Sequence, residues 1–159
     1  MTSPTPANPP APDASLVLDS QAIDRALRRI AAHIAAIEGV TPATGIIDVS
    51  MHRDDIRIRP RLPFVVASHL PPGLEDRTLV LADDVLFSGR TCRASMDSIA
   101  SFGRPARIQL AVLVDRGHRE LPIRADYVGK NLPTSPDQRI YVRFQSIDHV
   151  PDSVWIDKA

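Results

Sequence analysis

The clearest pattern along this chain is a set of short apolar runs that end in charged residues. One run covers 79–82 and is followed by Asp83 and Asp84. Another segment, Ile108–Val114, is apolar except for Gln109 and is followed by Asp115. Short continuous apolar runs are typical of parallel strands that are buried on both faces. A glycine-containing turn and a helix over Thr91–Ala100 are predicted after the first run. The pattern therefore predicts an α/β fold.

The remaining elements are weaker. A helix is expected to begin near Gln21, capped by Asp19 or Ser20, because apolar residues then recur at helical spacing up to Ile34. It is expected to end near Gly39, since glycine readily takes the left-handed conformation that closes a helix. Further strands are predicted in four segments: Gly45–Met51, Phe64–Ala67, Tyr127–Gly129 and Ile140–Phe144.

The segment from the first apolar run into its helix carries the most chemistry. Its strand delivers Asp83 and Asp84 to the carboxyl edge of the sheet, where ligands bind in open α/β folds. Backbone N–H groups at the start of the next helix suit a phosphate. Acids that accept hydrogen bonds from sugar hydroxyls, next to a phosphate loop, predict a sugar-phosphate site. The alternative for an Asp-Asp pair alone is a solvated turn that ends a strand.

Composition limits the remaining possibilities. The chain has 159 residues, 43% of them hydrophobic, and a formal net charge of zero, so one domain with a real core is expected and no global field attracts nucleic acid. Residues 1–14, with five prolines, are predicted to be a disordered leader before a domain over 15–159. The single cysteine, Cys92, and the lack of a long apolar segment predict a cytoplasmic protein that does not enter membranes. Cys92 itself is expected to be a small buried residue.

The stretch 79–91 resembles the phosphoribosyl pyrophosphate (PRPP) signature of type I phosphoribosyltransferases: apolar residues, two acids, more apolar residues, then a Ser-Gly-x-Thr loop. The longer run 113–135, with Asp115-Arg116-Gly117-His118-Arg119-Glu120 at its start, resembles the PyrR family of pyrimidine regulators. Gly103-Arg104-Pro105 and the segment 48–55 are similar to that family too. The resemblance covers the helix at 20–34 and nearly everything from 45 to 140.

This resemblance implies a type I phosphoribosyltransferase fold, a mostly parallel sheet flanked by helices. It implies a Mg²⁺-dependent transfer of ribose 5-phosphate from PRPP to uracil, which produces UMP and pyrophosphate. A second implied activity is UMP-responsive binding of pyrimidine operon leader mRNA, with transcription attenuation. A homo-oligomer, a dimer or larger, is also implied.

The roles of individual residues are implied in the same way. Asp83 and Asp84 would hold the ribose and Mg²⁺, directly or through water, and Arg53 would belong to a mobile loop over PRPP. The 5′-phosphate would lie on the loop made by Val85, Leu86, Phe87, Ser88, Gly89, Arg90 and Thr91. The uracil pocket would be bordered by Asp115, Val128, Gly129 and Lys130, and RNA would be contacted by His118, Arg119 and Arg124. Three arginines, at 57, 59 and 61, are read as a solvated face or as a flank of the PRPP loop.

One part of the family pattern is missing. Members carry an early strand and a loop that hold pyrophosphate, and here the first predicted helix leads through Gly39 almost directly to Asp48. The predicted fold therefore lacks one β-loop-α unit of about 30 residues. Three alternatives to the dual role stay open: a non-catalytic nucleotide-sensing RNA regulator, an inactive truncated homologue, and a phosphoribosyltransferase for purine or orotate, which the segment 115–135 disfavours.

Overall fold

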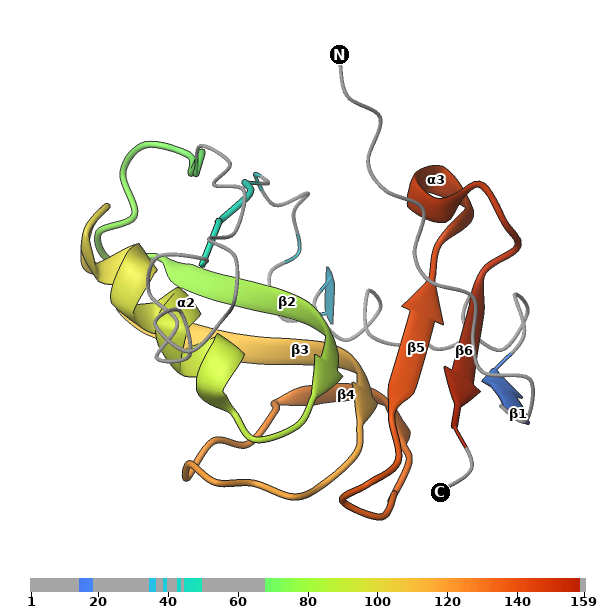
Figure 1. Cartoon of the computed structure of the whole chain (residues 1–159). Coiled ribbons are helices and arrows are strands. Elements are labelled where there is room, and N and C mark those ends of the chain that lie inside the picture. The colour runs from blue at the N-terminus through green and yellow to red at the C-terminus, as the bar shows by residue number, and fades with distance from the viewer. Residues whose placement is uncertain are drawn as a thin grey trace, which may run out of the picture.

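The computed structural model describes residues 68–157, together with 15–18, 35–36, 39, 43 and 45–49. In the labelling of Figure 1, its elements are β1 (Ser15–Leu18), β2 (Thr78–Leu86), α2 (Arg90–Ala100), β3 (Arg107–Asp115), β4 (Tyr127–Asn131), β5 (Ile140–Arg143), α3 (Gln145–Asp148) and β6 (Ser153–Ile156). None of the helices described here is long and apolar enough to cross a membrane.

The first sheet is parallel, as predicted, with the strand order β2-β3-β4. Its register pairs Leu86 with Asp115, and Asp115 with Asn131, so all three strands reach the same edge. β2 is longer than the apolar run that predicted it and continues through both acids to Leu86. Asp83 and Asp84 therefore belong to the strand itself, and its rigid ladder with β3 holds their backbone.

Helix α2 crosses one face of the parallel sheet (Figure 1). Its buried side includes Cys92, Ala94 and Ile99, and Cys92 joins a core cluster with residues of β2 and β3. That cluster consists of Leu81, Leu86, Cys92, Leu110, Val112 and Ala125. The prediction that Cys92 is a small buried residue is confirmed, since it is 5% exposed.

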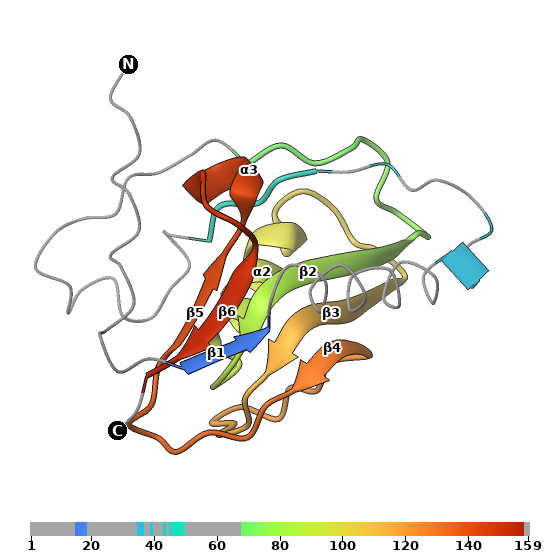
Figure 2. The ribbon, with the colours of Figure 1, turned by 90° about the vertical axis from the view of Figure 1, so that its right-hand side faces the viewer.

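The second sheet is antiparallel, with the order β1-β6-β5, and it lies beside the carboxyl ends of β2 and β3 (Figures 1 and 2). Val154 of β6 is fully buried against Leu113 and Val114 of β3. The sequence predicted β5 but neither β1 nor β6. β1 and β6 pair with each other from opposite ends of the chain, and no local periodicity records such a pairing.

The prediction of a strand over Gly45–Met51 is wrong for the described residues 45–49. Only Ile46 pairs, in an isolated antiparallel bridge to His69, and the N–H of Asp48 donates to the Ser68 hydroxyl at 2.9 Å instead of continuing a ladder. The predicted helix end is confirmed, because Gly39 has φ +65° and its N–H donates to the Ala35 carbonyl at 2.8 Å.

Several predictions lie outside the described residues. They are the leader over 1–14, the body of the helix before Ala35, Arg53, the arginines at 57, 59 and 61, and the strand Phe64–Ala67.

Candidate functional site at the carboxyl edge of the parallel sheet

The two acids of β2 are held by the backbone and have different surroundings. The Asp83 carboxylate accepts a hydrogen bond from the Asp84 N–H at 3.0 Å, and the Asp84 carboxylate accepts one from the Val85 N–H at 2.7 Å. Successive side chains of a strand point to opposite faces. Asp83 accordingly lines the cavity at this edge, whereas Asp84 is exposed and is not part of its lining.

The turn between β2 and α2 lines the same cavity. Gly89 is the N-cap of α2, with φ +90°, and a β-carbon there would lie 3.2 Å from the Ile123 side chain. Both the positive φ and the close approach require glycine. The helix has no side-chain cap and no acid in its first turn, so its N-terminus suits an anion.

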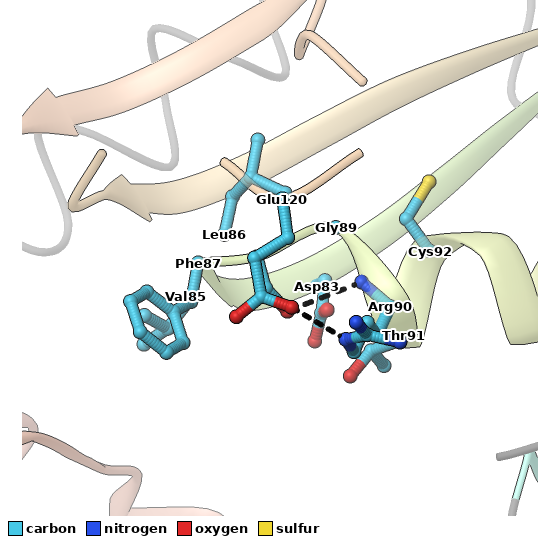
Figure 3. A pocket seen from close by; sticks show the side chains of 10 residues that line it. Asp83, Val85, Leu86, Phe87, Gly89, Arg90, Thr91, Cys92 and Glu120 are labelled. Atoms are coloured by element: carbon cyan, nitrogen blue, oxygen red, sulfur yellow. Dashed lines mark hydrogen bonds and ion pairs between the residues drawn. The ribbon is translucent and has the colours of Figure 1, made fainter. Parts of the chain in front are cut away.

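The cavity has a volume of about 300 Å³ and is open to solvent on one side. Its walls come from β2, from the start of α2 and from the loop after β3, as Figure 3 shows. The charged members of the lining are Asp83, Arg90 and Glu120, and Arg90 Nε donates to Glu120 Oε2 at 2.7 Å. Sequence reasoning assigned no role to Glu120, because it is 30 residues away from Arg90.

Burial determines the chemistry of Cys92, which lines the inner part of this cavity. Burial of the thiol, and secondly the negative charge of Asp83, raise the pKa of Cys92 above its ordinary value. A thiol with a raised pKa stays protonated near neutral pH and is a poor nucleophile. The site therefore contains no activated cysteine at this position.

Arg119 binds the loop after β3 to the phosphate loop. Its guanidinium donates to Asp115 Oδ2 at 2.5 Å and to the carbonyl of Phe87 at 2.9 Å. It also donates to the carbonyls of Gly117 at 3.1 Å and Ile123 at 3.0 Å. This side chain is only 23% exposed. The guanidinium of Arg119, predicted to contact RNA, is thus held by a carboxylate and backbone carbonyls of the protein itself.

Arg116 is a residue that sequence reasoning did not assign. It is 7% exposed, its guanidinium lies 4.1 Å from the centre of the Phe87 ring, and it donates to Thr134 Oγ1 at 3.0 Å and to the Gln138 carbonyl at 2.8 Å. Its burial lowers the pKa of Arg116 from the ordinary value. The sequence feature that could have identified Arg116 is its position directly after the buried strand β3, between Asp115 and Gly117. An arginine that is buried there must find hydrogen-bond acceptors.

The predicted uracil-site residues come together along two adjacent strands. The register pairs Val128 with Val112, and Lys130 with Val114, so β4 presents them next to β3. Asp115 ends β3, Gly129 is buried and Lys130 is exposed. None of these four lines the cavity that contains Asp83. Of the predicted RNA residues, His118 and Arg124 are exposed, and His118 packs edge-on against Phe87.

Comparisons with known proteins match most of the chain. The family model for the phosphoribosyl transferase domain matches residues 26–146. The chain is 56% identical over 128 residues to the "Bifunctional protein PyrR" of Roseiflexus sp.. This alignment covers 80% of the present chain and 70% of the relative. It is 50% identical over 133 residues to the protein of the same name from Listeria monocytogenes, which covers 82% of this chain and 73% of the relative.

The fold is also found among solved structures. The HGPRT-ase of Leishmania tarentolae in complex with GMP superposes with a TM-score of 0.63 at 17% identity, over 93% of this chain and 99% of that one. A hypoxanthine phosphoribosyltransferase of Staphylococcus aureus gives a TM-score of 0.61 at 19% identity, over 91% of each chain. At such low identity these two structures show the fold alone.

Proposed function

Because the chain belongs to the PyrR family, within the phosphoribosyltransferases, we propose that it converts uracil and PRPP into UMP and pyrophosphate and that it regulates pyrimidine gene expression. One observation supports this proposal most directly: Asp83 and the N-terminus of α2 line a single cavity. A carboxylate that can accept hydrogen bonds from sugar hydroxyls and a helix N-terminus that suits a phosphate therefore line the same cavity.

In this reaction the ribose carbon loses pyrophosphate and acquires oxocarbenium character, so the protein acts mainly by positioning and by charge. Asp83 would accept hydrogen bonds from the ribose hydroxyls. The segment 85–91 would hold the 5′-phosphate through its backbone donors. The uracil would be bordered by Asp115, Val128, Gly129 and Lys130, at the ends of β3 and along β4.

The residues present are compatible with Mg²⁺, which the family implies. Carboxylate oxygens are ligands that this cation prefers, and within the cavity Asp83 supplies them, whereas Asp84 lies on the opposite face of β2. No cluster of three His, Cys, Asp or Glu side chains exists among the described residues. The ion would therefore be held mainly by water and by the oxygens of PRPP, where it would neutralise the charge of the departing pyrophosphate.

For the regulatory role, we propose that leader mRNA is contacted by the exposed side chains of His118 and Arg124, on the loop next to the nucleotide site. Arginine and histidine suit an unpaired RNA loop, because they bind phosphate and stack on bases. Arg119 would support this surface by holding its loop in place. Assembly into a dimer or larger oligomer is part of the same proposal and is tested by light scattering on the purified chain.

A non-catalytic, nucleotide-sensing regulator is the second candidate. The observation that favours this candidate is the absence of the early β-loop-α unit from the sequence. Without its loop, the leaving pyrophosphate would lose preorganised donors, which are worth orders of magnitude in rate.

One assay separates the candidates. Purified protein is given uracil, PRPP and Mg²⁺, UMP formation is followed, and circular dichroism is recorded on the same sample. Turnover that disappears in the double variant Asp83→Asn, Asp84→Asn, with the fold intact, supports the enzyme. Binding of UMP without turnover supports the regulator. An unchanged rate in the double variant would show that these acids do not form the site.

A further inference from the structure

Glu120 lines the cavity, and its negative charge would repel a phosphate bound there. The proposed reaction gives this side chain no role, unlike Asp83. The carboxylate of Glu120 lines the cavity, and Figure 3 shows it directed at Arg90. The lining contains two acids, Asp83 and Glu120, and one base, Arg90. Among the described residues that line it, acidic side chains therefore outnumber basic ones by one.

The position of Glu120 is built into the fold. The N–H groups of Glu120 and Leu121 both donate to the Ser88 carbonyl at 3.1 Å, which joins the loop to the phosphate turn. Arg119, next in the chain, holds the same loop through Asp115 and the Phe87 carbonyl. The backbone that carries the Glu120 carboxylate is therefore fixed relative to the turn that would hold a phosphate.

The ion pair that Glu120 forms is of a kind that can be exchanged. Arg90 and Glu120 are 47% and 52% exposed, and pairs in such surroundings are weak because water and salt screen them. A phosphate carries more charge than a carboxylate and binds arginine with more acceptor oxygens. A phosphate in the cavity can thus take the guanidinium from Glu120 at small cost.

From this we infer that Glu120 determines the affinity of the site for phosphate, by occupying Arg90 until a phosphate displaces it. This inference rests on the proposed function, because it concerns the same 5′-phosphate site. The site binds a phosphorylated ligand by exchanging one anion for another. Ligands that lack the phosphate do not break the pair and are insensitive to Glu120.

The test is calorimetric titration of the full chain with UMP and with uridine, at low and at high salt. Glu120→Gln removes the competition of this carboxylate for Arg90 and is expected to tighten UMP binding about two- to fivefold at low salt, which is the range of an exposed ion pair. The gain should shrink at high salt. Uridine binding should not change.

The chain offers a matched control in the Arg93–Asp97 pair. It lies on the same helix, also has a separation of 2.7 Å, and both side chains are 47% exposed, but neither lines the cavity. Asp97→Asn removes the same kind of charge and should leave UMP binding as in the wild type. If Glu120→Gln and Asp97→Asn raise the affinity for UMP equally, the net charge of the protein alone explains the effect, and the inference is overturned.

A second variant distinguishes exchange from simple repulsion. In an Arg90→Gln background there is no cation to release, so Glu120→Gln should no longer tighten UMP. If Glu120→Gln still tightens UMP binding in that background, the carboxylate acts by repulsion and the exchange is refuted. If Glu120→Gln alone weakens UMP binding, the carboxylate positions Arg90, which also refutes the exchange. Absence of UMP binding by the wild type would contradict the proposed function as well, whereas equal binding by wild type and Glu120→Gln contradicts the inference alone.

Discussion

Replacing Arg119 by alanine tests the conclusion that this side chain is a structural link. The guanidinium is 23% exposed and its partner Asp115 is 18% exposed, so the pair is largely buried. The change removes the charge partner of Asp115 and leaves carbonyls of Phe87, Gly117 and Ile123 without this donor. Breaking a buried pair by removing one member costs about 3–5 kcal/mol, and the partial exposure favours the lower end, about 3 kcal/mol.

The assay is urea unfolding followed by circular dichroism, with a thermal melt alongside. A loss of about 3 kcal/mol corresponds to a fall in Tm of roughly 6–12 °C for a chain of this size. Arg124→Ala is the control, since Arg124 is exposed and should stay within about 0.5 kcal/mol of the wild type. If both variants unfold at the same urea concentration, Arg119 is not a link and its prediction as a direct RNA contact becomes the better explanation.

Three further predictions concern the thiol, the RNA surface and the core. Because its pKa is raised, Cys92 should be alkylated slowly in the folded protein and at the ordinary rate in urea. The unfolded thiol loses its proton first, so the stability of the folded state should fall as the pH rises from the unfolded pKa through the raised folded pKa. Asp83→Asn should speed alkylation of the folded protein, because it removes the negative charge that is the second cause of the shift. Arg124→Ala should weaken leader RNA binding and reduce its salt slope by about one, and an unchanged slope in filter binding would remove Arg124 from the interface. Val154→Ala, at a fully buried position, should cost about 2 kcal/mol in urea unfolding, and a cost near zero would contradict the packing of β6 on β3.

Local pattern was sufficient for the strand, turn and helix around the acids. The apolar run before Asp83, the glycine at 89 and the helix after it follow rules that act over a few residues. The parallel pairing of β2, β3 and β4 also followed, because buried apolar runs favour it. Sequence could not show that β2 continues to Leu86, since the two acids interrupt the apolar run although the ladder with β3 does not stop there.

The site is where tertiary structure decided most. The sequence placed Arg119 among the RNA residues, and only the fold brought its guanidinium to the Phe87 carbonyl, 32 positions away. The same is true of Glu120 beside Arg90, of Arg116 over the Phe87 ring, and of β1 and β6 in one sheet. These contacts join segments far apart in the chain, and no periodicity of two or 3.6 residues records them. The amino-acid pattern determines which faces are apolar and where turns occur, whereas the partner of a buried charge depends on which distant acceptor the packed core leaves within reach.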